Sequence, residues 1–238
     1  MLTELKIIRN ILIRLVLGFF FFTFIFLFLP VEWLGGSFSN WVIGQIRVQF
    51  IPEGAVLAVL GPLDAFFSQA TVAAFLACLL LVPMAFVELW RFAAPALDPR
   101  EAAIFAAGLV GALFLSAFGA YFSYILLVPL MFTELFMFVP NGVEAIFNLQ
   151  KVVSLIAGFV LGCALIFLLP LVMIILSYIG LIPARLWAAY ARPAVLLVLV
   201  ASAIITPDGS GVGMVLLSVP VCALYAVGYS GAVLATKE

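Results

Sequence analysis

Long apolar stretches separated by short polar ones dominate this chain. The apolar stretches lie near residues 10–30, 68–89, 103–128, 152–177, 188–205 and 214–235. At about 1.5 Å of rise per residue, a helix over each of the first four would cross the roughly 30 Å hydrocarbon core of a bilayer. The fifth is confined by Arg192, Pro193 and Pro207, so we expect a locally thinned bilayer or shelter behind neighbouring helices. The pattern predicts an all-α integral membrane protein with six transmembrane helices.

The basic residues orient these helices. With the N-terminus inside, every lysine and arginine falls on the inner side except Arg47 and Lys151. Because cytoplasmic loops are enriched in these residues, we expect both chain ends to face the cytoplasm or its organellar equivalent. The longest extramembrane part, about 31–67, then lies outside. Its amphipathic pieces, 41–50 and 63–67, are expected to lie along the membrane interface.

The start of the chain superficially resembles a secretory signal peptide, since Lys6, Arg9 and Arg14 precede the uncharged run 15–29. It is longer than the usual signal segment, and Pro30 and the residues after it do not form a cleavage site of small residues. We therefore expect a retained first helix. No repeat or linker interrupts the chain, so a single domain is predicted over 1–238.

Composition limits the chemistry that the chain can perform. Hydrophobic residues make up 68% of its 238 residues, charged residues 9%, and the mean hydropathy is +1.40. The absence of histidine removes the usual general base and the commonest metal ligand. Cys78, Cys163 and Cys222 stand alone in apolar stretches. We expect no enzyme activity, no cofactor and no metal site, and the net charge of −1 gives no sign of nucleic-acid binding.

Small residues mark one face of the third predicted helix. Gly108, Ala112, Ser116 and Ala120 recur at four-residue spacing, which lets a neighbouring backbone approach closely. We favour packing within the molecule over an oligomer interface as the reason.

The fourth and sixth predicted helices carry no charge, over 152–177 and 214–235. Ion-coupled carriers usually place ionisable groups inside the membrane, so this absence argues against one. Pro83 and Pro170 are expected to kink the second and fourth helices.

One polar, proline-rich island, residues 83–101, stands out against this background. It reads PMAFVELWRFAAPALDPRE, and its charged residues are Glu88, Arg91, Asp98, Arg100 and Glu101. It lies on the predicted cytoplasmic side, and its prolines restrict its shape. If the chain recognises anything from water, we expect recognition here.

The island resembles the first cytoplasmic loop of the TatC family, the multispanning receptors of twin-arginine translocation. The family pattern QxWxFxxPALxxxE is matched in order and spacing by Trp90, Phe92, Pro95, Ala96, Leu97 and Glu101. Weaker matches follow in family order along the chain. They are LTELKIIRNILIRL with Glu4 and Arg14, GPLDAFF with Pro62, the third-helix run with Gly119 and Pro129, Pro170 in the fourth helix, and SAIITPD with the turn residue Asp208.

This resemblance implies a concave bundle of kinked helices and a receptor without catalytic chemistry. TatC proteins bind the twin-arginine signal peptides of folded cargo. They then recruit single-span TatA/TatB-type subunits into a translocation site driven by the proton-motive force, in a complex expected to be oligomeric. By resemblance, Glu4 and Glu101 bind the paired guanidiniums and Phe92 adds an apolar contact. Glu88 stands where the family usually has glutamine, and either enlarges this acidic patch or pairs with Arg91 or Arg100.

The chain departs from the family at polar positions inside the membrane. Leu168 replaces a glutamate common in the fourth helix, Ala226 an acid of the sixth, and Val212 a polar residue near its start. These changes weaken the expectation of partner docking more than that of signal recognition. Two alternatives stay open, a structural subunit of a larger membrane complex and a small-solute carrier. The expected location is a bacterial or an organellar inner membrane.

Overall fold

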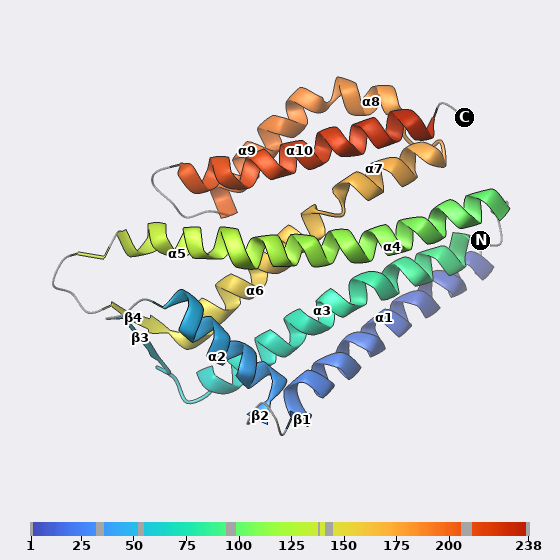
Figure 1. Ribbon diagram of the computed structural model, residues 1–238. Helices are drawn as coiled ribbons and strands as arrows, with labels where there is room; N and C mark the ends of the chain where they lie inside the picture. The colour runs from blue at the N-terminus through green and yellow to red at the C-terminus, as the bar shows by residue number, and fades with distance from the viewer. Residues whose placement is uncertain are drawn as a thin grey trace. The chain divides into compact units, whose positions relative to one another are not determined.

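The computed structural model of the chain describes residues 2–31, 36–51, 55–93, 99–137, 139–140, 145–205 and 211–236. They are mostly helical, as the apolar pattern predicts (Figure 1). They group into two compact units, Met1–Ala102 with Val139–Leu161, and Ala103–Phe138 with Gly162–Glu238. Each unit is described by itself, and the single domain over 1–238 stays a prediction.

The first unit is built on a pair of long helices. Its elements are α1 (Leu2–Phe28), β1 (Pro30–Val31), β2 (Gly36–Ser37), α2 (Phe38–Phe50), β3 (Ala55–Ala58), α3 (Asp64–Ala93), the first turn of α4 (Pro99–Phe122), β4 (Ala145–Asn148) and most of α6 (Leu149–Ile166). Helices α1 and α3 lie side by side (Figure 1). Phe20, Phe21 and Phe24 of α1 are exposed, as expected of side chains that face lipid.

Short strands in the first unit were not predicted from the sequence. β1 pairs with β2 in antiparallel fashion, and β3 pairs with β4 in parallel, with Ala58 opposite Asn148. Two parallel strands cannot be joined by a tight turn, so they come from segments far apart in the chain, and no local pattern predicts their pairing.

The second unit contains the remaining helices. They are the rest of α4, a π-helical turn (Ser123–Leu127), α5 (Val128–Met137), the end of α6, α7 (Leu169–Tyr178), α8 (Ala184–Ala189), α9 (Ala191–Ile205) and α10 (Val212–Ala235). Its core includes the fully buried Val128 and Met173. The helix α10 packs along α7, where Gly228 faces Pro170 and Met173 at close range.

Five stretches within the described residues are long and apolar enough to cross a membrane. They are Arg9–Phe28, Asp64–Val82, Gly108–Met137, Leu149–Tyr178 and Leu217–Ala235. The fifth predicted helix appears as the shorter apolar stretch Ala191–Ala203, consistent with the short core expected there. Six helical segments are thus present where six were predicted, and five of them have full spanning length.

Two boundaries differ from the prediction. The third helix was expected to end near residue 128 but continues through Pro129 to Met137, because the π-helical turn absorbs the proline and Val128 N donates to Ser123 O. The second helix, expected to begin near residue 68, begins at Asp64 and so includes most of the piece 63–67. The amphipathic piece 41–50 lies in the helix α2, whose N-cap Ser37 accepts from Asn40 N. The location of both pieces along the membrane interface stays a prediction.

The expected kink at Pro170 is a full break. α6 ends at Ile166, a turn follows at Phe167 and Leu168, and α7 resumes at Leu169 with Pro170 in its first turn. α3 instead runs as one helix through Pro83. The small-residue face of α4 packs within the second unit, since Gly108 and Gly111 lie against Leu171 and Ala112 and Ser116 are buried.

Candidate functional site

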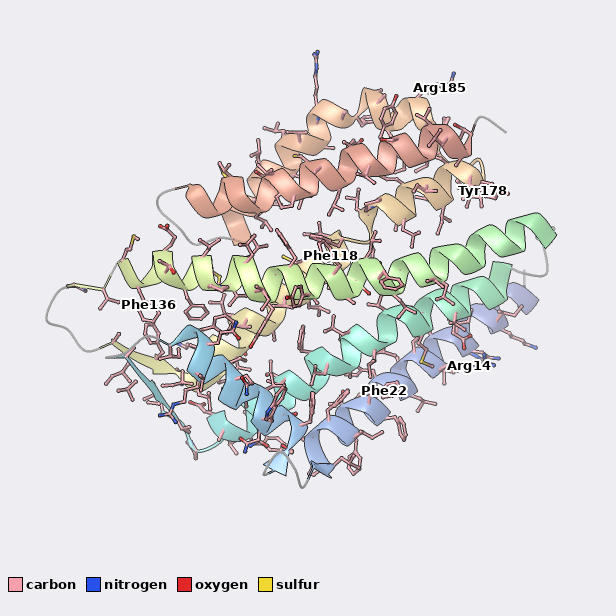
Figure 2. The ribbon with its side chains drawn as sticks, in the orientation of Figure 1. Arg14, Phe22, Phe118, Phe136, Tyr178 and Arg185 are labelled. Carbon is pink, nitrogen blue, oxygen red and sulfur yellow. The ribbon has the colours of Figure 1, made fainter. Side chains whose placement is uncertain are left out.

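An ion pair joins the two long helices of the first unit near their predicted cytoplasmic ends. Arg14 Nη1 donates to Glu88 Oε2 at 3.1 Å and to Oε1 at 3.3 Å, across 74 positions of sequence. Figure 2 shows Arg14 on α1. The Glu88 side chain is only 5% exposed, whereas that of Arg14 is 54% exposed. A carboxylate taken out of water needs a charged partner, and Arg14 provides it from the neighbouring helix.

This contact bears on the role of Glu88. The sequence suggested an acid of the recognition patch or a partner of Arg91 or Arg100, whose side chains lie outside the described residues, so that pairing stays a prediction. The carboxylate is buried and bonded to Arg14, a residue that the sequence placed only near the entry of the first helix. A guanidinium arriving from solvent would meet a carboxylate that is already occupied and screened.

The other predicted recognition residues belong to the same unit. The backbone of Glu4 lies in α1, that of Phe92 in α3 and that of Glu101 in the first turn of α4, all within Met1–Ala102. Their side chains lie outside the described residues. Glu101 follows Pro99 at the start of α4, where the helix dipole favours a carboxylate.

Some of the family-motif residues are described and others are not. The described ones each mark a helix start, a close contact or a helix interruption, and they are Pro62, Gly119, Pro129 and Pro170. Trp90 is described in its backbone only, in α3, and Pro95, Leu97 and Asp208 lie outside the described residues.

Gly119 shows why a small residue is needed at its position. A Cβ on Gly119 would lie 2.7 Å from Phe167 Cγ and 3.1 Å from the Cα of Ala164. Phe167 also meets the rings of Phe118 and Phe122, with centroids 5.8 and 5.7 Å away. The turn between α6 and α7 therefore packs directly onto α4.

The first unit holds a second polar cluster at its predicted outer end. Asp64 Oδ2 accepts from Gly61 N at 2.9 Å and from Asn148 Nδ2 at 2.7 Å, and Asn148 Oδ1 accepts from Lys151 N at 3.0 Å. Asp64 thus completes the cap of α3, and Asn148 caps α6. The sequence signals were present, with Pro62 ahead of an acid and an asparagine ahead of an apolar run, but their contact spans 84 positions.

The two positions at which the resemblance suggests intramembrane acids carry apolar residues. Leu168 is buried at the break between α6 and α7, and Ala226 is exposed on α10. Among the described residues, no three His, Cys, Asp or Glu side chains gather closely enough to hold a metal ion.

Comparison with known proteins agrees with this arrangement. The family described as Sec-independent protein translocase protein (TatC) matches residues 3–220. The chain belongs to the TatC family. Its membership makes it a multi-pass membrane subunit of the twin-arginine protein translocase, and the family is one of transport proteins.

Individual TatC proteins show how far the likeness extends. The chain is 34% identical over 188 residues to the Sec-independent protein translocase protein TatC of Cenarchaeum symbiosum (strain A), covering 79% of this chain and 71% of that protein. It is 26% identical over 205 residues to the chloroplastic TATC of Pisum sativum, covering 84% of this chain and 58% of that one. The crystal structure of the Twin Arginine Translocase Receptor TatC superposes with a TM-score of 0.80 at 24% identity, covering 98% of this chain and 100% of that one. This structural likeness shows a shared TatC fold.

Proposed function

We propose that this chain is the receptor that binds twin-arginine signal peptides of folded cargo and nucleates their translocation, driven by the proton-motive force. The observation that carries the proposal is the antiparallel packing of α1 and α3. It brings the N-terminal end of α1, with Glu4, to the same end of the pair as Phe92 on α3. α4 starts at Pro99, a short connection later, and brings Glu101 into the same unit.

The chemistry fits paired guanidiniums. Two carboxylates held on separate rigid helices can each accept charge-assisted bonds from an arginine, whereas lysine cannot form the same planar fork. In this proposal Glu4 and Glu101 face the arginines and Phe92 contacts the apolar part of the peptide. We place Glu88 behind this patch, since Arg14 already holds its carboxylate.

Single-span TatA/TatB-type subunits are the proposed partners, and the chain itself catalyses no reaction. The proposal places their recruitment after signal binding, in an oligomeric assembly. The apolar Leu168 and Ala226 require that docking here use packing rather than intramembrane acids.

A binding measurement on the full chain in lipid nanodiscs tests the receptor role. The probes are a fluorescent signal peptide with paired arginines and the same peptide with paired lysines. Replacing both acids, E4A with E101A, removes two charge-assisted contacts and should weaken arginine-peptide binding by at least about tenfold. The control E134Q changes an acid on α5, at the predicted outer end, and should bind normally. Equal binding by wild type and the double variant would refute the site.

Complementation of a TatC-deficient strain with a folded twin-arginine reporter tests the translocase role in cells. Export of the reporter is the expected result. A chain that binds no signal peptide, fails to export the reporter and co-purifies with other membrane subunits would instead be a structural subunit. Solute uptake by the isolated chain in liposomes would indicate a carrier.

A further inference from the structure

Two contacts show how α1 and α3 are aligned along their length. Arg14 faces Glu88, and four residues further along α1, a Cβ on Gly18 would lie 3.2 Å from Met84 Sδ and 3.3 Å from Leu81 Cδ2. From the first contact to the second, the residue number rises by four on α1, from Arg14 to Gly18, and falls by four on α3, from Glu88 to Met84. This is the alignment of two antiparallel helices without slip.

Continued toward the N-terminus, the same alignment reaches the proposed recognition residues. Phe92 lies one turn beyond Glu88, about 6 Å along the axis. Glu4 lies ten residues before Arg14, about 15 Å along the axis, whereas α3 ends after five residues, about 7.5 Å. The first turns of α1 thus extend past the end of α3 at Ala93.

α4 follows α3 after a short connection. Only six Cα–Cα steps separate Ala93 from Pro99, a reach of at most about 22 Å. Glu101 comes two residues later, in the first turn. The height of Glu4 relative to Glu101 therefore depends on how α1 is aligned on α3.

Apolar packing is less directional than a charge pair. The sequences of α1 and α3 are rich in Phe, Leu, Ile and Val, whose burial is favourable but non-directional. A buried charge pair is different, because a shift would separate the Glu88 carboxylate from the Arg14 guanidinium. Polar contacts within apolar helix interfaces are known to specify register.

We propose that Arg14 and Glu88 are positioning residues of the signal-peptide site: their ion pair fixes the register of α1 on α3 and thereby sets Glu4 against Glu101. The inference rests on the proposed receptor function, but its structural half can be measured separately. It assigns Glu88 to the site through Arg14 rather than through contact with the peptide.

Spin-label distances measure the register directly. The labels are placed at the exposed positions Ile7 and Leu80 as I7C and L80C, in a chain whose three native cysteines are replaced by alanine. The variant R14L/E88L keeps an apolar interface and so preserves the helix pair, but it removes the directional contact. We expect its distance distribution to broaden or to shift by about one helical turn, roughly 5.4 Å. The reciprocal pair R14E/E88R should restore the wild-type distribution.

Peptide binding then tests the consequence. R14L/E88L should bind the paired-arginine peptide about tenfold more weakly than wild type and lose its preference over the paired-lysine peptide, and R14E/E88R should recover both. The control R9L removes a cation from the same helix and should change neither readout. A merely structural pair predicts wild-type distance and binding in R14L/E88L, because the packing is retained, and that result would overturn the inference.

The two proposals fail separately. If E4A/E101A binds normally, the receptor site is wrong whatever the spin labels show. If E4A/E101A loses binding while R14L/E88L keeps both its distance and its affinity, the receptor site stands and the positioning role is wrong.

Discussion

Asn148 uses both ends of its amide to join two helices. Its Oδ1 accepts from Lys151 N at 3.0 Å and so caps α6, while its Nδ2 donates to Asp64 Oδ2 at 2.7 Å, in the first turn of α3. The backbone of Asn148 is also paired with Ala58 through β3 and β4. One side chain therefore ties the predicted outer ends of two membrane helices together.

Replacing this asparagine should destabilise the protein. N148A removes an N-cap, worth about 1 kcal/mol, and a hydrogen bond to a carboxylate, worth about 1.5–3 kcal/mol, so a loss of roughly 2.5–4 kcal/mol is expected. Thermal unfolding in detergent, followed by tryptophan fluorescence, measures it. The matched control N40A changes an exposed asparagine on α2 and should unfold as wild type does. The side-chain amide of Asn40 has no bonded partner among the described residues, and its backbone N–H, which donates to Ser37 Oγ, is kept in the variant. A smaller effect in N148A than in N40A would contradict the role of the contact.

Gly119 should not tolerate even a methyl group. In G119A the new Cβ would lie within 2.8 Å of the Phe167 side chain and 3.1 Å from the Cα of Ala164, and a backbone atom cannot move aside cheaply. We expect a loss of about 1–3 kcal/mol in the free energy of unfolding.

G158A is the matched control for this substitution. Gly158 lies in the helix α6, and a Cβ there would meet no heavy atom within 4 Å. Because alanine favours helix over glycine, G158A should be neutral or more stable by about 0.5–1 kcal/mol. Equal effects of the two substitutions in the unfolding assay would show that the contact at Gly119 is not limiting.

The Tyr225 hydroxyl should hold α8 against α10. It donates to the Trp187 carbonyl at 2.6 Å, and Trp187 Nε1 donates to the buried Ser177 Oγ at 2.9 Å. Y225F leaves that carbonyl without its donor and should cost about 1–2 kcal/mol, with a change in Trp187 fluorescence. Y229F removes an exposed hydroxyl on the same helix that has no bonded partner within the described part of the chain, and should leave both unchanged. Identical spectra and stability for the two variants would argue against the link.

The charge pair should respond differently to single and double replacement. R14L removes the Arg14 guanidinium from the buried Glu88 carboxylate, and because Arg14 is half-exposed we expect a cost of roughly 1–3 kcal/mol. In R14L/E88L the charge itself is gone, so the free energy of unfolding should return to within about 1 kcal/mol of wild type. A double-mutant cycle by thermal unfolding measures the coupling, and additive single effects would show that the two side chains do not interact.

Much of the fold could be read from local pattern. Runs of about 20 apolar residues predict membrane helices because an unpaired backbone cannot exist in lipid, and five of the predicted helices have full spanning length. The break at Pro170 followed from the missing N–H of proline. The continuation of the third helix through Pro129 could not be predicted. A π-helical turn at Ser123–Leu127 precedes the proline, and no local sequence pattern indicates such a turn.

The candidate site shows the same division. The spacing from Trp90 to Glu101 placed the recognition loop and the family by sequence alone, since those residues are neighbours in the chain. Arg14, which pairs with Glu88, lies 74 positions away, so no local pattern points to the contact. The partners that the sequence suggested, Arg91 and Arg100, are near in sequence, and their side chains lie outside the described residues.

By itself, the sequence determined the membrane class, the five full-length apolar helices and the family, because hydrophobic length and short motifs are local properties of a chain. Only the tertiary structure decided which faces meet: Arg14 with Glu88, Asp64 with Asn148, and Gly119 with Phe167. The physical reason is that long apolar helices offer many nearly equivalent ways to pack. A few distant polar pairs and close glycine contacts then select one of them, and those pairs become visible only when the helices lie side by side.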